Sequence, residues 1–423
     1  MASVDSDYAA PVAFERTASA IASARRAALA DRYPLDSFTV EWRWLADLVA
    51  IADDWRELAA RALEPNVFYE PAFALAAAAV FGRDVGAALV WSDAARRELV
   101  GLFPARVTRR RYGLALPVLE GWTHPYGPLG TPLVVRQAAE PVIAAWLAYL
   151  AGNRGLPGLL FLPLLAEEGL FAGALGASLR RLQMPHADFA RHQRPLLQPG
   201  DDRHAYLDHA VSAHRRRELR RSVRRLADLG ALCFAASSDP VAVVRDSEDF
   251  FALETGGWKG ERGTAAVQNE AVRAFMTAAI RALGAQGKVA VNRILLDGRA
   301  IAATITLRSG DGAWYWKTAY DEAYARHAPG VLLSAALTED LAANSAIART
   351  DSCAAPGNPI LDGLWRERLA LCDRLIALRP QAPFPWACRL ESLRGAAQVT
   401  VKSMRARLGH RQRVRSLPRR HQE

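Results

Sequence analysis

The chain has 423 residues, and its 51% of apolar residues is enough for two or three domains with sizeable cores. Its most hydrophobic region, residues 156–177, is interrupted by Pro163, Glu167 and Glu168, which excludes a membrane span there. The four cysteines form no C-x-x-C pair, which argues against a zinc ribbon or a disulfide framework and for a reducing cytoplasm.

The net charge of +10 is concentrated at the C-terminal end, where residues 398–423 carry eight Lys or Arg and one acid. We interpret residues 386–423 as a basic tail and residues 1–34 as a flexible lead-in without the pattern of a secretory signal. A solvated tail is the simpler interpretation. The alternative is attraction to nucleic acid or to anionic lipid, which would give a cytoplasmic protein a peripheral contact with the inner membrane.

The first half alternates helical and strand patterns. Residues 40–45 predict a strand, residues 47–63 and 71–81 predict helices, and residues 86–91 and 98–107 predict a hairpin. After the segment THPYGPLGTP come a helix over 137–150, a strand over 159–165 and a helix over 170–181.

The second half repeats this order. The patterns predict helices over 211–229, 246–256, 269–283 and 330–343, and strands over 232–236, 289–296, 300–307, 314–320 and 347–353. Asp297-Gly298 is a strong hairpin signal between two of these strands. We therefore predict a mixed α/β protein with two copies of one unit, residues 35–190 and residues 191–385, joined near residues 185–205.

The segment WYWKTAYDEAYARHAPGVLL, from Trp314 to Leu333, is the best candidate binding site. A strand there leads through a short loop into a helix, and the amides and dipole of a helix start attract anions. The predicted phosphate-binding residues are Arg326, His327, Ala328, Pro329, Gly330, Val331 and Leu332. The alternative is an ordinary connection with proline at the first helical position.

Five phrases occur in an order that resembles the CelD/BcsL-type acetyltransferases of the GNAT superfamily: RRRELRRSVRRLADLG, LETGGWKG, LDGRAIAATITL, YWKTAYDEAYARHAPGVLL and DSCAAPGNPILDGLWRERL. That family is similar in architecture to the Fem-type aminoacyl transferases of peptidoglycan synthesis. The resemblance implies tandem GNAT-like domains, the first of them degenerate, and acetyl-CoA or another acyl-CoA as co-substrate. It implies a splayed pair of strands that admits the pantetheine arm, and a role in exopolysaccharide or cellulose biosynthesis.

The loop departs from the usual GNAT pattern, Q/R-x-x-G-x-G/A, because this chain has R-H-A-P-G-V. Proline has no N–H, so the phosphate cradle lacks one donor. No histidine or cysteine spacing suggests a metal site, and we expect no metal.

Acyl transfer needs a proton acceptor and donors to the developing oxyanion. The predicted catalytic residues are Asp351 as general base, Lys317 as a cation facing the acyl group or an acidic acceptor, and Tyr320. Strict alternation places Lys317 on the strand face opposite Trp316 and Tyr320. Asp351 as a turn cap and Lys317 at a sheet edge are the structural alternatives. Cys353 lacks the partners of a nucleophile.

On the acceptor side, the predicted substrate-binding residues are Glu254, Trp258, Lys259, His124 and Tyr126. A tryptophan ring stacks well on a sugar, although a core position is the commoner fate of tryptophan. His124 and Tyr126 belong to the loop of the first half that corresponds to the cofactor loop of the second.

The run from His214 to Leu226 contains seven arginines and an apolar stripe, which predicts a solvated amphipathic helix. It has no interleaved aromatics, so sequence-specific nucleic-acid binding is not expected. We expect acyl transfer to a glycan or small-molecule amine or hydroxyl. The alternatives are aminoacyl transfer from transfer RNA and a non-catalytic subunit of a polysaccharide synthase.

Overall fold

The protein folds around one mixed sheet. The computed structural model describes residues 38–92, 98–256, 269–358 and 360–397, and the strand order within them is β1-β2-β3-β4-β6-β13-β7-β12-β11-β10-β9-β8, with β5 paired to β3 beside this path. The strands are β1 (Phe38–Trp44), β2 (Val85–Ser92), β3 (Glu98–Thr108), β4 (Val118–Gly121), β5 (Leu133–Val134), β6 (Leu159–Ala166), β7 (His186–Leu197), β8 (Leu232–Ser237), β9 (Val289–Leu296), β10 (Arg299–Ser309), β11 (Gly312–Tyr320), β12 (Arg349–Asp351) and β13 (Glu367–Ala377).

The α-helices are α2 (Ala52–Ala60), α3 (Pro71–Phe81), α4 (Ala139–Gly152), α5 (Leu170–Arg181), α6 (Tyr206–Ala210), α7 (Ala213–Ala227), α8 (Pro240–Gly256), α10 (Glu270–Gly284) and α11 (Pro329–Ala343). Short 3-10 helices are η2 (Leu45–Ile51), η3 (Val67–Tyr69), η4 (Arg136–Ala138), η6 (Glu322–His327) and η7 (Leu361–Gly363). Each described helix is too short or too polar to span a bilayer.

Local chemistry explains several helix starts. The Ser212 hydroxyl accepts a hydrogen bond from the Arg215 N–H at 3.2 Å and caps α7. The Asn269 side chain caps α10 in the same way, by accepting from the Val272 N–H. Proline at the first positions of α3 and α11 fits the helix because the missing N–H would have no intrahelical acceptor.

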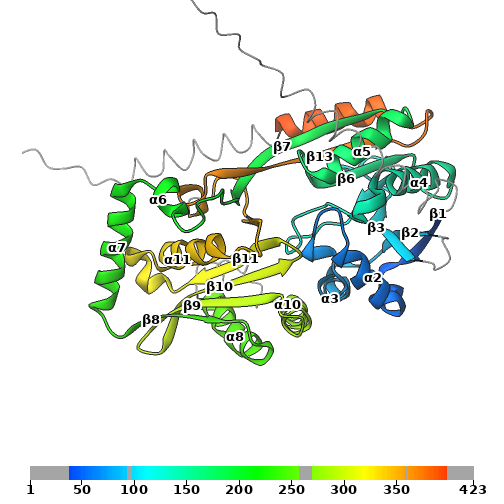
Figure 1. Cartoon of the computed structure of the whole chain (residues 1–423). Coiled ribbons are helices and arrows are strands. Elements are labelled where there is room, and N and C mark those ends of the chain that lie inside the picture. The colour runs from blue at the N-terminus through cyan, green and yellow to red at the C-terminus, as the bar shows by residue number, and fades with distance from the viewer. Residues whose placement is uncertain (1–37, 93–97, 257–268, 359, 398–423) are drawn as a thin grey trace, which may run out of the picture.

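The predicted mixed α/β fold with two similar halves is confirmed. In each half a short parallel strand pair, β4 with β6 or β11 with β12, lies next to antiparallel strands. The halves are interleaved, because β13 pairs with β6 of the first half while β7 pairs with β12 of the second. β7 and β13 pair with each other and run between the halves (Figure 1). The boundary predicted at 190/191 therefore lies inside β7.

Apolar packing also joins the two halves. α8 and α10 pack on one face of the β9–β11 sheet, and α11 with α7 packs on the other. The ring of Phe73 in α3 lies 5.5 Å from that of Phe275 in α10 and 5.6 Å from that of Trp316 in β11, measured between centroids. A part-buried ion pair between Glu70 and Lys288 adds a polar tie. One continuous core thus fixes the halves against each other.

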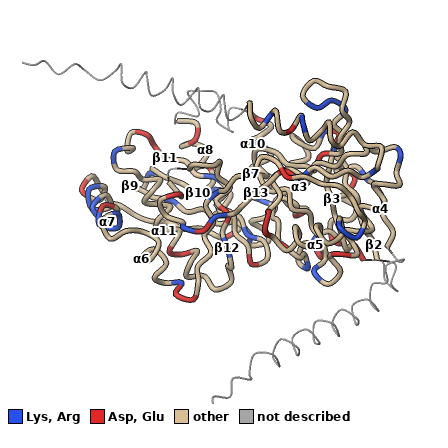
Figure 2. Tube along the Cα trace, turned by 90° about the horizontal axis from the view of Figure 1, so that it is seen from above, with Lys and Arg blue, Asp and Glu red and all other residues tan. Residues whose placement is uncertain are grey.

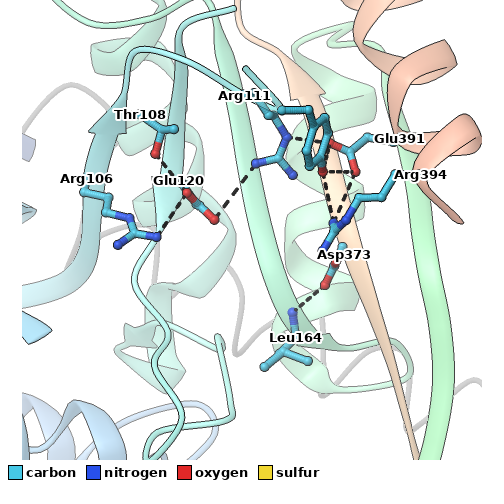
Figure 3. A network of polar contacts seen from close by, with 9 residues as sticks. Arg106, Thr108, Arg111, Glu120, Leu164, Asp373, Glu391 and Arg394 are labelled. Carbon is cyan, nitrogen blue, oxygen red and sulfur yellow. Dashed lines mark hydrogen bonds and ion pairs between the residues drawn. The ribbon is translucent and has the colours of Figure 1, made fainter. Parts of the chain in front are cut away.

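The C-terminal segment differs from the prediction. Residues 384–397 are helical, so the tail predicted from residue 386 begins at the earliest after residue 397, and residues 398–423 lie outside the described residues. This last helix is held by Glu391, which is 5% exposed and accepts from the Arg111 Nε at 2.5 Å (Figure 3). Tyr112 and Arg394 complete the network around this carboxylate. The segment is a packed part of the fold.

Several element bounds also differ, two of them near the site or at the start of the fold. The helix predicted over 47–63 is split into η2 and α2, and the strand predicted over 347–353 is β12, with only three residues. β12 is short because its chain leaves β11 after Asp351. This departure creates the candidate site.

Candidate active site

A gap opens between β11 and β12. The two strands pair in parallel only at Gly312 with Arg349, Ala313 with Thr350 and Trp314 with Asp351. β11 continues for six residues to Tyr320, and the structure shows no strand on this edge of residues 315–320 within the described part of the chain. The splayed strand pair that the family resemblance implies is therefore present.

A β-bulge changes the direction of the side chains at this gap. Ile305 of β10 pairs with Lys317 and Thr306 pairs with Tyr315, so Trp316 is the extra residue of β11. Trp316 and Lys317 consequently both reach the first half of the chain. The prediction that strict alternation puts them on opposite faces is wrong, because a bulge interrupts the two-residue period.

Lys317 meets the loop that follows β4. Its ammonium nitrogen lies 4.2 Å from the centroid of the Tyr126 ring, a cation–π geometry. The Trp316 indole N–H donates to the Tyr126 carbonyl at 2.8 Å. The loop predicted to form the acceptor side thus borders the strand predicted to carry catalysis, although these residues are 190 positions apart.

His124 lies in an aromatic stack within this loop. Its ring is 4.5 Å from that of Phe81, with an interplanar angle of 11°, and its Nδ1 accepts weakly from the Tyr126 N–H at 3.4 Å. Burial and, secondarily, the charge of Lys317 lower the pKa of His124 to about 3. The imidazole is therefore neutral at neutral pH and adds no charge to the site.

Glu254 lies close to this group, at the end of α8. Its side chain is buried, and its charge, together with the larger effect of burial, raises the pKa of Tyr126. The Tyr126 phenol therefore stays protonated at neutral pH and can donate a hydrogen bond. Trp258 and Lys259, which were predicted to bind the acceptor, lie outside the described residues.

Asp351 is held by a partner that sequence reasoning missed. Its Oδ2 accepts from the Arg194 Nη2 at 2.5 Å, and its Oδ1 accepts from the Cys353 N–H at 2.9 Å. Arg194 is 2% exposed, and its Nη1 donates to the Pro128 carbonyl at 2.9 Å. These bonds tie β12 to β7 and to the loop after β4. They favour a structural function over the predicted function of Asp351 as general base.

Cys353 lies just after β12, beside the gap. Burial, then the neighbouring charge of Asp351, raises the pKa of its thiol well above the usual range. A thiol that remains protonated is a poor nucleophile. The structure and the sequence therefore both argue against Cys353 as a nucleophile, since the sequence shows no partner residues for it.

The start of α11 offers fewer backbone donors than predicted. Val331 and Leu332 both donate to the Ala328 carbonyl, at 2.9 and 3.1 Å, and Pro329 has no N–H. In this first turn, no acceptor for the Gly330 amide is found among the described residues, and Gly330 is buried. The favourable end of the helix dipole is present, but most amides of the predicted cradle are already bonded.

The other residues of this loop divide between surface and interior. Arg326 is exposed, and its Nε donates to the Nε2 of buried His327 at 2.9 Å. The imidazole of His327 is therefore held by Arg326 within the loop. Tyr320 packs against Gly330 and α11, apart from Lys317, so the three predicted catalytic residues do not form one cluster.

What comes together at the gap is a set of residues from both halves. Lys317, Tyr126, His124 and Glu254 gather on one side, and the Arg194–Asp351 pair anchors the other strand. Within the described residues, no three His, Cys, Asp or Glu side chains lie together as metal ligands. The arrangement can place a cation and a protonated phenol near a group lying along β11.

Sequence comparison identifies a family match in the second half. Residues 213–356 match a family described as an acetyltransferase (GNAT) domain, which covers β8 to β12 and therefore both strands of the gap. No curated protein matches the chain in sequence.

Several solved structures can be superposed on most of the chain. "Crystal structure of FemX" matches with a TM-score of 0.52 and 9% identity, over 80% of this chain and 98% of that one. A tandem GNAT protein from the clavulanic acid biosynthesis pathway matches at 0.39 and 16%, over 81% and 100%. The C-terminal domain of a putative lysylphosphatidylglycerol synthetase from Agrobacterium fabrum matches at 0.48 and 10%, over 78% and 92%. The likeness to FemX shows a shared fold. The chain has a GNAT-type acyltransferase fold.

Proposed function

We propose that this protein transfers an acyl group from a coenzyme A thioester to an amine or hydroxyl acceptor. The proposed acyl group is acetyl, and the proposed donor is acetyl-CoA. The observation that carries the proposal is the parallel ladder that stops after Trp314 and Asp351, where β12 leaves the edge of β11 beside Lys317. An extended pantetheine arm has amide groups that match such an edge. The GNAT family match over these strands supports the same donor.

The chemistry is direct attack. A lone pair of the acceptor nitrogen or oxygen adds to the thioester carbonyl, the C–S bond breaks, and the departing thiolate takes up the proton that the acceptor releases. In this proposal Lys317 stabilises the oxyanion, and the protonated phenol of Tyr126 donates to the same oxygen or to the departing sulfur. Because Asp351 is ion-paired with Arg194, it orders β12 and the loop after β4.

The acceptor is a sugar of a cell-surface polysaccharide or of its lipid-linked precursor. The resemblance to the CelD/BcsL-type acetyltransferases supports this choice, and the partly buried Tyr126 borders the gap beside Lys317, where such an acceptor would lie. Glu254 would bind acceptor hydroxyl or amino groups from the other side.

Calorimetry with the full chain tests the donor. Acetyl-CoA is expected to bind with a micromolar dissociation constant and to raise the melting temperature, since a ligand that binds only the native state stabilises it. Acetyl transfer to a panel of amino sugars and neutral oligosaccharides, followed by mass spectrometry, then identifies the acceptor. Absence of acetyl-CoA binding together with absence of transfer would refute the proposal.

The exposed arginines of α7 favour a second candidate, aminoacyl transfer from charged transfer RNA. This reaction would require RNA binding that weakens steeply with salt. Retention of transfer RNA at low salt, with no binding of acetyl-CoA, would support it. A non-catalytic subunit of a polysaccharide synthase would instead bind neither donor.

A further inference from the structure

A cavity beside the start of α11 is lined by arginines from two elements. It has a volume of about 240 Å³, and its charged lining consists of Arg215, Arg221, Arg225 and Arg326 against one acid, Glu218. Its floor includes Ala328 and Val331 of the helix start. The cavity therefore lies where α7 meets the loop between β11 and α11.

The positive charge of this cavity is only partly compensated. Arg215 pairs with Glu218 at 3.3 Å. For Arg221 and Arg225, no acidic group within 4.0 Å is found among the described residues, and both side chains are exposed. A second cavity on the other side of α7 is less basic, because Asp208 and Glu339 accompany its three arginines there. Figure 2 shows the basic positions gathered along α7.

The geometry points to a phosphate site made of side chains. At the start of α11, Pro329 has no N–H and the next two donors after Gly330 are bonded to the Ala328 carbonyl, so the backbone contributes little. Guanidinium groups bind phosphate through two parallel hydrogen bonds and keep their charge at any physiological pH. We propose that Arg221 and Arg225 of α7, with Arg326, bind the phosphate groups of the donor in place of a glycine-rich loop.

This inference rests on the proposed function, because it assumes a coenzyme A donor, and it specifies how that donor is recognised. The apolar stripe of Leu219, Val223 and Leu226 holds α7 against the second half of the chain and aims Arg221 and Arg225 at the cavity. Recognition by three guanidinium groups predicts selectivity for donors with several phosphates. It also predicts affinity that falls with ionic strength.

The test compares two α7 variants of the full chain by calorimetry. The double variant Arg221→Gln/Arg225→Gln removes the proposed contacts. Arg217→Gln is the matched control, because Arg217 is exposed on the same helix and lines neither cavity. We expect the dissociation constant for acetyl-CoA to rise at least about tenfold in the double variant and to stay within about twofold in the control.

Comparing coenzyme A with a donor that has fewer phosphates shows whether Arg221 and Arg225 contact the phosphate groups. Wild-type protein is expected to bind dephospho-coenzyme A more weakly than coenzyme A, and this preference should shrink in the double variant. If the double variant and the control both bind acetyl-CoA as wild type does, the inference is wrong while the proposed function stands. If the double variant loses only retention of transfer RNA, the inference is also wrong. If wild type binds no acetyl-CoA, the proposed function fails and the inference fails with it.

Discussion

The ammonium group of Lys317 lies 4.2 Å from the centre of the Tyr126 ring. This cation–π contact joins a strand of the second half to a loop of the first half. The bulge at Trp316 makes this contact, since it turns Lys317 to the same side as Trp316. The site is therefore shared between the halves, and neither half alone contains it.

The Tyr126 ring is expected to orient Lys317. Tyr126→Leu removes the cation–π contact, which contributes about 0.5–2 kcal/mol, and should reduce kcat/KM for acyl transfer by roughly tenfold. Tyr126→Phe keeps the ring and removes only the hydroxyl, so it should lose less activity than Tyr126→Leu, which removes both. If Phe and Leu reduce kcat/KM equally, the hydroxyl matters and the ring does not.

Breaking the Arg194–Asp351 pair should lower stability. Asp351→Ala leaves a buried guanidinium without its counter-charge, which costs about 3–5 kcal/mol of unfolding free energy, measured by urea denaturation. Glu391→Ala is the control, because it breaks the similarly buried pair with Arg111 far along the chain from the gap (Figure 3).

These two variants decide the function of Asp351. If the Asp351 carboxylate is structural, both variants should lose stability, and both should retain kcat within a few-fold of wild type when assayed in the folded state. If Asp351→Ala stays as stable as wild type but loses about a hundredfold or more in kcat, Asp351 is the general base after all.

Neutral His124 makes the fold sensitive to mild acid. Its folded-state pKa of about 3 is below the usual 6.5, so the unfolded chain takes up this proton first as the pH falls. The contribution is fully present above pH 6.5 and is lost progressively between about pH 6.5 and about pH 3. At about pH 5.5 the loss is about 1 kcal/mol.

His124→Phe keeps an aromatic ring in the stack and removes the proton site. The fall in unfolding free energy between about pH 7 and about pH 5.5 should be smaller for this variant than for wild type. An equal fall in both proteins would show that His124 does not titrate as its surroundings indicate.

Cys353 should react slowly with alkylating reagents. Because burial raises the pKa of its thiol, little thiolate exists at about pH 8, whereas Cys233 is exposed. Mass spectrometry after brief iodoacetamide treatment should find Cys233 labelled well before Cys353. Faster labelling of Cys353 would indicate a reactive thiol and reopen its role in catalysis.

Regular local patterns allowed much of the fold to be predicted. The helices over 71–81 and 170–181 match α3 and α5, because continuous apolar stripes bounded by proline or glycine need no distant information. β7 and β13 were missed. β7 has eight partly or fully exposed residues before its buried end, so it lacks a clear two-residue period, and its neighbours come from distant parts of the chain.

The candidate site was predictable in position but not in its contacts. The loop before α11 follows from the strand-to-helix pattern, and the gap beside Trp314 was expected from the family resemblance. The partners of Asp351 and Lys317 follow from neither, because Arg194 is 157 residues from Asp351 and the bulge at Trp316 has no sequence signal. Non-local pairing and one inserted residue therefore decided which side chains meet.

A crystal structure of the full chain with bound coenzyme A would locate the donor directly. We expect the pantetheine arm to lie in the gap, along residues 315–320 of β11, with its thiol end toward Lys317 and its phosphates beside the start of α11. A coenzyme A molecule bound elsewhere, or a gap closed by the protein's own side chains at saturating ligand, would contradict this expectation.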